Sequence, residues 1–242
     1  MRYGIFSDIH ANLEAFNAVF QAYQKEKIDQ YLCIGDVVGY AANPKGCLKK
    51  LKEIANFCVA GNHDWASVDL FSLDYFNPVA KAAIIWTQRN LDDQERYFLQ
   101  SLKLVYKNKD LTLVHGTLDE PQDFHYLTDT YLAAQTFDLA KNQVCFIGHS
   151  HVAGIYIQDQ EKSINYLETD LIEIKGQNKY IINVGSVGQP RDDNPEAAYC
   201  IYDTEKEEIK IKRISYDIET ARSKIIKAGL PRILGDRLLL GR

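Results

Sequence analysis

Side chains that can bind metal ions recur directly after short apolar runs of this sequence. Five of its six histidines lie at such positions, together with two aspartates and an asparagine. In an open α/β sheet, the carboxyl ends of parallel strands meet at one crevice, so residues far apart in sequence can address one small volume. The set exceeds the ligands of one tetrahedral ion and suits two ions that share a carboxylate. Its members are Asp8, His10, Asp36, Asn62, His63, His115, His149 and His151.

The spacing within this set supports a shared site. Asp8 and His10 are two positions apart, as are His149 and His151, and in an extended backbone such residues project to the same side. The run 61–64, Gly-Asn-His-Asp, follows the apolar run 57–60 and presents an amide, an imidazole and a carboxylate consecutively. Taken alone, this run is typical of an ordinary turn. Its functional interpretation therefore depends on the other strand ends.

The hydrophobic pattern predicts the elements that would position these residues. Strands are expected over residues 3–7, 31–34 and 57–60, separated by a helix that begins after Asn12 and a helix over 45–54. This β-α-β-α-β order favours parallel strands joined by right-handed crossovers. Further along, the pattern predicts helices over 78–90, 92–102 and 129–141, an antiparallel hairpin formed by 104–106 and 111–114, and a strand over 144–147.

The second half of the chain is predicted to be mostly antiparallel. Short strands are expected over 153–158, 163–168, 179–183, 197–203 and 208–214, followed by a helix over 218–228 and an apolar tail over 230–240. No change in composition marks a domain boundary. We therefore expect one domain over residues 1–242, with two sheets packed face to face and helices on their outer faces.

Composition and charge narrow the classes of function. Of the 242 residues, 46% are hydrophobic and 25% are charged, as in an ordinary globular protein. The net charge of -5, with no long basic run, argues against a surface that binds duplex nucleic acid. No stretch has the length of a signal sequence or a membrane span. Five cysteines without a C-x-x-C pair indicate a reducing compartment, and we expect a cytoplasmic protein.

Five motifs, in order along residues 8–151, resemble those of the calcineurin-like metallophosphoesterases. They are D-x-H at Asp8, G-D-x-x-G at Gly35, G-N-H-D at Gly61, V-H-G at Val114 and G-H-S-H at Gly148. The segment 183–191, N-V-G-S-V-G-Q-P-R, is similar to a loop of the small bacterial and archaeal phosphodiesterase branch, with Val184 where proline is usual. The resemblance implies a four-layer α/β/β/α sandwich with two mixed sheets.

The same resemblance implies an activity and a cofactor. We expect a phosphoesterase that cleaves phosphodiesters of small phosphorylated substrates such as nucleotides, with two divalent metal ions sharing the attacking hydroxide. Oxygen and imidazole ligands without a thiolate suit manganese or iron, and are compatible with zinc or nickel. A phosphoprotein or phosphomonoester phosphatase is the alternative, and a metal-binding scaffold without catalysis is a third interpretation.

The roles that the resemblance implies divide the polar set. Asp8, His10 and His151 would hold one ion, and Asn62, His115 and His149 the other. Asp36 would bridge the two ions, and His63 would stabilise or protonate the leaving oxygen. Two further candidates rest on position alone: Arg191 follows a glycine-rich loop and Tyr40 lies in the loop after Asp36, and we expect both to contact the substrate.

One motif departs from the protein-phosphatase branch. That branch reads G-D-x-x-D-R-G, and its second aspartate pairs with the catalytic histidine, whereas Gly39 and Tyr40 stand here. Asp64 could orient His63 instead, or it could be an ordinary charge at a helix N-terminus.

A few remaining residues near these motifs are interpreted as structural. We expect His125 to be structural or exposed. We interpret the aromatic residues that follow the G-N-H-D run as packing beneath the next helix rather than as a wall for a nucleobase. They are Trp65, Phe71, Tyr75 and Phe76.

Overall fold

The computed structural model describes residues 1–242. Along β1 (Arg2–Phe6) and β6 (Val144–Ile147), successive side chains point alternately into two apolar cores on opposite faces of the sheet to which each strand belongs. In β1, Ile5 enters the core between the two sheets and Phe6 enters the core beneath the helices. In β6, Phe146 lies between the sheets and Ile147 faces the opposite side. A strand that is apolar on both faces must be covered on both, so this pattern builds a stack of layers.

The first sheet has six strands in the order β3-β2-β1-β11-β12-β9. Its members β1, β2 and β3 pair in parallel, and β11, β12 and β9 add antiparallel strands at the other side of β1. The sheet is therefore mixed, as expected. Beyond β1, its strands are β2 (Gln30–Cys33), β3 (Phe57–Cys58), β9 (Leu171–Glu173), β11 (Ala197–Asp203) and β12 (Glu208–Ile214).

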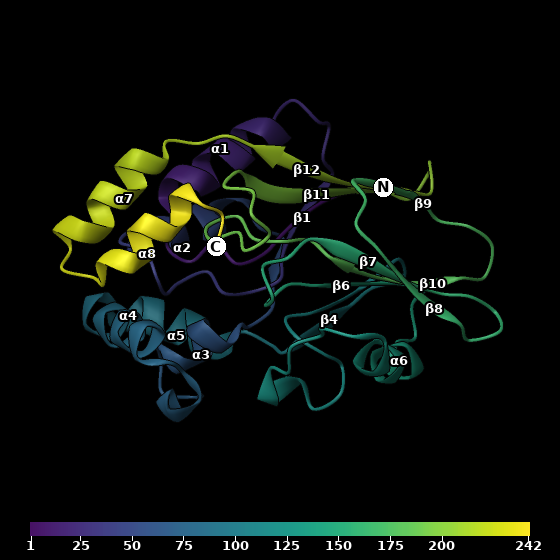
Figure 1. Cartoon of the computed structure of the whole chain (residues 1–242), viewed down its shortest axis with the longest axis horizontal. Helices are drawn as coiled ribbons and strands as arrows, with labels where there is room; N and C mark the ends of the chain where they lie inside the picture. The colour runs from purple at the N-terminus through teal and green to yellow at the C-terminus, as the bar shows by residue number, and fades with distance from the viewer.

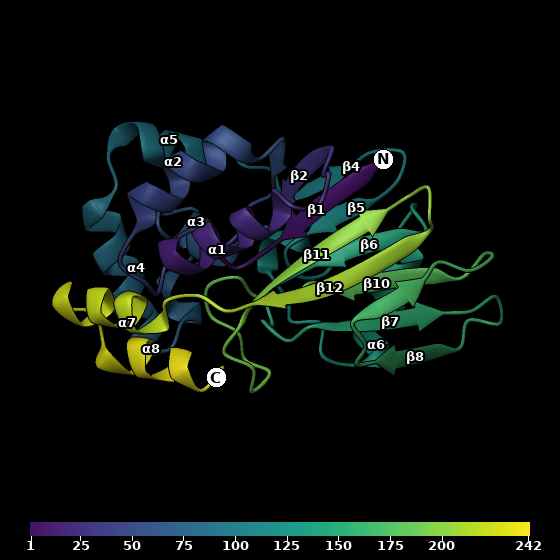
Figure 2. The same ribbon diagram turned by 90° about the horizontal axis from the view of Figure 1, so that it is seen from above.

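The second sheet also has six strands, in the order β4-β5-β6-β10-β7-β8. It is mixed too, because β6 is parallel to β5 and β10, whereas the β4–β5 hairpin and the β10-β7-β8 strands are antiparallel. Figures 1 and 2 show the two sheets face to face. Beyond β6, the strands are β4 (Val105–Lys107), β5 (Thr112–Val114), β7 (Gly154–Gln158), β8 (Ile164–Leu167) and β10 (Lys179–Asn183).

Helices cover the outer face of each sheet. The helices α1 (Leu13–Tyr23), α2 (Pro44–Ile54) and α5 (Asp93–Ser101) contribute to the core on the first sheet. A single helix, α6 (Thr130–Leu139), covers the second sheet, and Figure 1 shows it apart from the other helices. The layers therefore follow the α/β/β/α order that the sequence predicts.

Three further helices form a cluster next to the ends of the strands. Apolar side chains of α4 (Pro78–Asn90), α7 (Ile218–Lys227) and α8 (Arg232–Asp236) form a core with Tyr40 and its neighbours. In both views the yellow helices α7 and α8 lie beside each other, and the C-terminus lies beside α8. The end of the chain is thereby brought close to the loop that carries Tyr40.

Several expected elements differ from those observed. The strand predicted over 57–60 is shortened to two residues, and the run that follows it opens a short helix, α3 (Asn62–Ala66). Strand β9 and helix α8 lie in segments for which no such element was expected, because edge strands and short helices carry little periodic signal. Short 3-10 helices occur at Leu73–Tyr75, Pro121–Asp123 and Arg237–Leu239.

None of the helices combines the length and the apolar composition that crossing a bilayer requires.

Candidate metal centre

Loops at the ends of five elements bring the eight predicted site residues together. Strands β1, β2, β5 and β6 each lead into such a loop, and the N-terminus of α3 follows β3. Every one of the eight residues is at least 93% buried. Ligand atoms of Asp8, His10, Asp36 and His151 lie within 4.8 Å of one another, as do those of Asp36, His115 and His149. Asp36 is thus common to two groups that could each hold an ion.

The backbone at these loops is not extended, which corrects the reason given for the spacing. Five of the seven predicted metal ligands adopt left-handed conformations, with φ between 48° and 67°. Such conformations are costly for residues other than glycine and persist only where the surroundings enforce them. The pairs converge because the loops curl at the strand ends rather than because residues alternate along a strand. The five residues are Asp8, His10, Asp36, His149 and His151.

Three imidazoles are anchored from behind by backbone carbonyls. Nδ1–H of His115 donates to Ile34 O at 2.7 Å, and Nδ1–H of His151 donates to Gln189 O at 2.5 Å. Nδ1–H of His10 donates to Val38 O at 3.2 Å. Such bonds fix the tautomer and direct the Nε2 lone pair to the opposite side, where it can bind a cation.

The two carboxylates are held in the same way. Asp8 Oδ2 accepts from the His149 backbone N–H at 3.1 Å, and Asp36 Oδ1 accepts from the His63 backbone N–H at 2.8 Å. The second oxygen of each faces the imidazoles: Asp8 Oδ1 lies 3.3 Å from His151 Nε2, and Asp36 Oδ2 lies 3.3 Å from His115 Nε2.

Glycines allow the carboxylates to sit this close to the neighbouring loops. A Cβ at Gly61 would meet Asp36 Oδ1 at 2.1 Å, and a Cβ at Gly148 would meet Asp8 Oδ2 at 2.6 Å. Neither distance is sterically tolerable, so a side chain at either position would displace a carboxylate.

The charges of the centre are shared between acids and imidazoles. Burial by itself would raise the pKa of Asp8 and Asp36, but the neighbouring imidazoles lower both pKa values below the ordinary range. Burial likewise opposes protonation of His115, yet the charge of Asp36 raises the pKa of His115 to about 10. The acids are therefore ionised, and without a metal ion a proton on His115 offsets part of their charge.

Unpaired polar atoms in the centre fit a bound cation. Asp8 Oδ1, Asp36 Oδ2, Asn62 Oδ1 and His115 Nε2 are buried without a hydrogen-bond partner. In addition, His10 Nε2 and His151 Nε2 lie 3.0 Å apart, although burial lowers the pKa of both imidazoles and their Nδ1 atoms carry the donated protons. Two facing lone pairs repel unless a cation binds them, and orphaned buried acceptors are costly. Divalent ions bound here would accept the facing lone pairs of the two imidazoles and would be partners for the orphaned acceptors.

His63 is oriented by ring packing. Its ring lies 4.4 Å from the ring of Tyr40, 4.8 Å from that of His10 and 5.0 Å from that of Phe76, measured between centroids. Its Nδ1 has no hydrogen-bond partner, and a Cβ at Gly39 would lie 2.5 Å from that atom. Burial lowers the pKa of His63 to about 4. A neutral imidazole without a carboxylate partner thus stands beside the metal-binding cluster.

Asp64 does not orient His63. Its Oδ1 accepts from the backbone N–H groups of Val37 at 2.9 Å and Val38 at 3.2 Å, and its Oδ2 accepts from Gly61 N–H at 3.1 Å. The Gly61 bond caps α3, so the alternative of a helix N-terminal charge describes part of its role. The other two bonds join α3 to the loop that carries Asp36.

An aromatic cavity of about 260 Å³ opens beside His63, Asn62 and His149. Phe71, Tyr75 and Phe76 line it, and Phe76 also packs against the core that contains Ala80 and Ala83 of α4, as expected. Trp65 is not part of the lining and instead packs edge-on against Phe124. Residues 71–76 show no helical period of apolar side chains and form only a short 3-10 helix at Leu73–Tyr75. No single face of this segment is therefore buried, and its rings can border the cavity.

Four further residues of this cavity, Asp123 to Tyr126, come from the irregular segment after the V-H-G motif. The ring of Tyr126 stacks on His149 with centroids 3.8 Å apart and an interplanar angle of 14°. Sequence reasoning passed over Tyr126, although the run Phe124-His125-Tyr126 close behind a ligand motif is a signal that could have indicated it. His125 is about half exposed, as expected, and also lines the cavity.

Arg191 and Tyr40 contact each other at the rim of the centre. Arg191 Nη2 donates to Tyr40 Oη at 3.2 Å and to Gln189 Oε1 at 2.9 Å. Tyr40 also packs on His10, with ring centroids 4.5 Å apart. The structure therefore places these two residues next to the predicted ligands.

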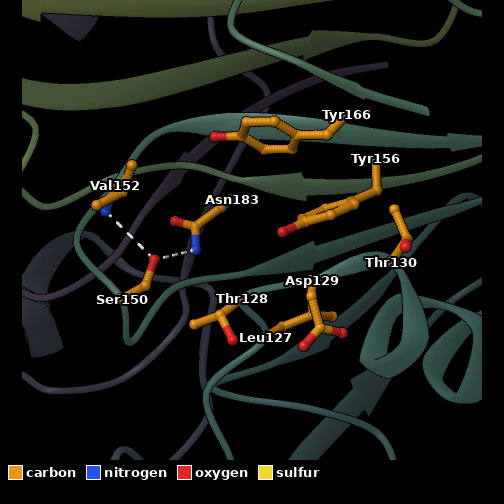
Figure 3. Close-up of a pocket in the computed structure, with 9 residues that line it drawn as sticks. All are labelled: Leu127, Thr128, Asp129, Thr130, Ser150, Val152, Tyr156, Tyr166 and Asn183. Atoms are coloured by element: carbon orange, nitrogen blue, oxygen red, sulfur yellow. Dashed lines mark hydrogen bonds between the residues drawn. The ribbon is translucent and has the colours of Figure 1, made fainter.

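A separate cavity of about 490 Å³ lies behind the loop that carries His149 and His151 (Figure 3). Ser150 Oγ lines this cavity and accepts from Val152 N–H and Asn183 Nδ2. Its lining contains one carboxylate, Asp129, and no cationic side chain. This cavity is consequently less suited to an anionic substrate than the space beside His63.

Known proteins resemble this chain over its whole length. The sequence model of the calcineurin-like phosphoesterase superfamily domain matches residues 1–207. An uncharacterised protein of Methanocaldococcus jannaschii is 39% identical, over 98% of this chain and 97% of its own. The crystal structure of a metallophosphoesterase from Sphaerobacter thermophilus has a TM-score of 0.88 at 35% identity, covering 100% of this chain and 99% of that one. A hypothetical protein of Pyrococcus horikoshii shares the fold, with a TM-score of 0.80 at 17% identity over 100% and 98%.

Proposed function

The chain belongs to the calcineurin-like phosphoesterase superfamily, and from this membership and the buried cluster we propose a dinuclear, metal-dependent phosphodiesterase. Its substrates would be small phosphorylated molecules such as nucleotides. The observation that carries the proposal is the shared carboxylate: Asp36 belongs to two groups of potential ligands at once. One acidic side chain between two sets of imidazoles is what a pair of bridged divalent ions requires.

Each side chain has a part in this proposal. Asp8, His10 and His151 would hold one ion, and Asn62, His115 and His149 the other, with Asp36 between them. When bound, such ions supply positive charge to the phosphoryl oxygens and lower the pKa of a coordinated water. Manganese or iron suits the nitrogen and oxygen ligands, and zinc or nickel is compatible.

His63 would act on the leaving oxygen. Its side chain lines the aromatic cavity beside the cluster and holds no hydrogen bond to another side chain. With its pKa lowered to about 4, the imidazole is neutral near pH 7, so it would donate the proton of one ring nitrogen as a hydrogen bond. That donation is strongest when the leaving oxygen becomes negative.

Several features favour diesters of small molecules. The G-D-x-x-G motif at Gly35 lacks the second aspartate and the arginine of the G-D-x-x-D-R-G motif in the protein-phosphatase branch. Gly39 stands where that aspartate would be and leaves no room for a side chain against His63. Tyr40 and Arg191 would contact the substrate, and the aromatic cavity would receive one of its organic groups.

All five cysteines are free, which supports a reducing, cytoplasmic compartment.

The test is cleavage of a diester and a monoester by the same preparation. Protein stripped with a chelator should be inactive, and manganese should restore cleavage of bis-p-nitrophenyl phosphate in preference to p-nitrophenyl phosphate. Restored activity on the monoester alone would support the phosphatase alternative. Fewer than one ion bound per chain, under conditions that saturate the site, would support a scaffold.

A further inference from the structure

We propose that the C-terminal segment, which comprises α7, α8 and the residues after them, adds an anion-binding subsite next to the aromatic cavity. The subsite would hold a second phosphate group of the substrate. The subsite is a cavity of about 740 Å³ whose lining includes Arg191 and Arg237. Its use in turnover rests on the proposed function, whereas its preference for a second phosphate can be measured by binding alone. The substrate class would then be a nucleotide with at least two phosphate groups.

The subsite adjoins the aromatic cavity. Tyr40, Asn77 and Tyr126 line both cavities, so the two spaces meet at these three residues. Tyr40 also links the subsite to the metal-binding cluster, because its ring contacts His63 and its hydroxyl accepts from Arg191. A single ligand can therefore reach from the cluster into both cavities.

Two of the three arginines of the subsite, Arg191 and Arg237, are not paired with an acidic side chain. No side-chain carboxylate lies within ion-pair distance of Arg191, which donates only to a tyrosine hydroxyl and a glutamine carbonyl. Its Nε is buried and has no hydrogen-bond partner. Arg237 likewise has no side-chain carboxylate partner and donates to the backbone oxygen of Arg242. Half-buried guanidinium groups of this kind are well suited to phosphate oxygens.

The other charges at the subsite are already engaged. Asp236 lines the cavity, but its two oxygens bind Arg222 at 2.8 Å and Arg232 at 3.1 Å. Arg242 is paired with Asp193. The net positive charge therefore comes from Arg191 and Arg237.

These two arginines also act on each other. Burial, and then the charge of Arg191, lower the pKa of Arg237. Like charges that share a cavity repel, and an anion between them would relieve that repulsion. The repulsion between the two arginines and their lack of acidic side-chain partners both favour a bound anion.

The source of the second arginine makes the subsite a feature of this chain's C-terminal segment. The superfamily model ends at residue 207, whereas Arg237 lies beyond α7 and α8. Those helices are held against α4 and Tyr40 by an apolar core, which places their end beside the cleft. Loops within residues 8–151 supply the cluster, and the segment after the C-terminal helices supplies the second anion contact.

The size and chemistry of the two cavities define the ligand. Aromatic rings at Phe71, Tyr75 and Phe76 can stack on a base, and the arginines can bind a phosphate. A mononucleotide with one phosphate at the cluster would leave the two arginines without an anion to bind. A nucleoside diphosphate or a nucleoside bisphosphate would engage the cluster and both cavities.

The experiment compares binding of AMP with that of two ligands that carry a second phosphoryl group. These are the methylene analogue of ADP, whose P–C–P bridge is not hydrolysed, and adenosine 3′,5′-bisphosphate. Calorimetry on the manganese-loaded protein should show at least one of them binding about 10-fold or more tightly than AMP. Arg237→Gln should remove most of that preference, and Arg237→Lys, which keeps a cation, should retain part of it. Equal binding of all three ligands by the wild type would overturn the proposal.

The matched control is Lys227→Gln, which removes an exposed cation from the same segment that neither lines the subsite nor pairs with Asp236. This variant should keep the wild-type preference, and a preference retained in Arg237→Gln would overturn the proposal. If Arg237→Gln does not fold, the wild-type preference must still fall as salt is raised to about 0.5 M, and a preference insensitive to salt would overturn it. Hydrolysis of bis-p-nitrophenyl phosphate is scored separately, so loss of the proposed function and loss of the subsite give different results.

Discussion

Replacing Asp64 by asparagine should destabilise the fold and weaken metal binding without altering the tautomer or orientation of His63. The carboxylate of Asp64 is fully buried and accepts three backbone N–H groups, two from the loop after β2 and one from Gly61. The first two hold the loop of Asp36, and the third caps the helix that presents His63. Asp64 is therefore a connection between two ligand loops.

The magnitude follows from those three bonds. Asparagine keeps one oxygen, which can still accept from Val37 and Val38, but its NH₂ group faces the Gly61 N–H and leaves two donors opposed. Losing that hydrogen bond leaves the buried Gly61 N–H unsatisfied and costs about 1–3 kcal/mol. Asp64→Ala leaves three buried N–H groups unpaired and should cost about 3–9 kcal/mol, at about 1–3 kcal/mol for each. The two variants should therefore be ordered, with alanine the less stable.

The assay is urea denaturation of metal-free and manganese-loaded protein, together with titration of manganese. Asp64→Asn should lower the free energy of unfolding in both forms and raise the dissociation constant for manganese. A variant with unchanged stability and metal affinity, but with reduced turnover and a shifted pH profile, would refute the reasoning. That outcome would mean that Asp64 acts on the His63 ring.

The pH dependence of this effect has a definite sign. Burial and the charge of Asp36 raise the pKa of Asp64 to about 7, well above the value of about 3.9 in an unfolded chain. Between these values the native protein holds a proton that the unfolded chain has lost, so the free energy of unfolding falls as pH rises. Asp64→Asn removes this titration. In metal-free protein, the stability advantage of the wild type should therefore narrow between about pH 5 and about pH 8.

Three other changes test the centre. His63→Ala should keep both ions in metal analysis but lower kcat by about 10²- to 10⁴-fold, and survival of activity would remove His63 from the mechanism. Asp36→Ala should lose both ions together, whereas retention of two ions would contradict the shared ligand. The pKa of His63, lowered to about 4, makes the unfolded chain bind more protons between pH 4 and 6.5. Acidification to about pH 5 should thus cost the metal-free wild type on the order of 2 kcal/mol more than metal-free His63→Ala by urea titration, and equal losses in the two proteins would refute this cause.

Local sequence signals predicted most elements near the site. Asn12 caps the helix that was expected to begin after it, and the helix Pro78–Asn90 has the predicted bounds. These features depend on neighbouring residues alone: a capping oxygen, a proline at the first turn and a repeating apolar face. Strand β9 and helix α8 were missed because their stability depends on what they pack against.

The partners of each strand were harder to predict than the strands themselves. The antiparallel pair β11 and β12 joins the first sheet beside β1, more than 190 residues away in sequence, as in the pairing of Gly4 with Ile201. No local pattern encodes such a pairing, because a strand that is apolar on both faces fits either sheet.

By itself, the sequence determined which residues form the centre, because metal-binding side chains placed after buried strands must meet where the strands end. Only the tertiary structure decided how those residues are held. The left-handed loops, the carbonyls behind three imidazoles and the rings around His63 come from segments that meet only on folding. The same is true of Asp64, whose partners are backbone groups of another loop, and of Arg237, which the C-terminal helices bring to the cleft. Side-chain direction depends on these long-range contacts, and a one-dimensional pattern does not contain them.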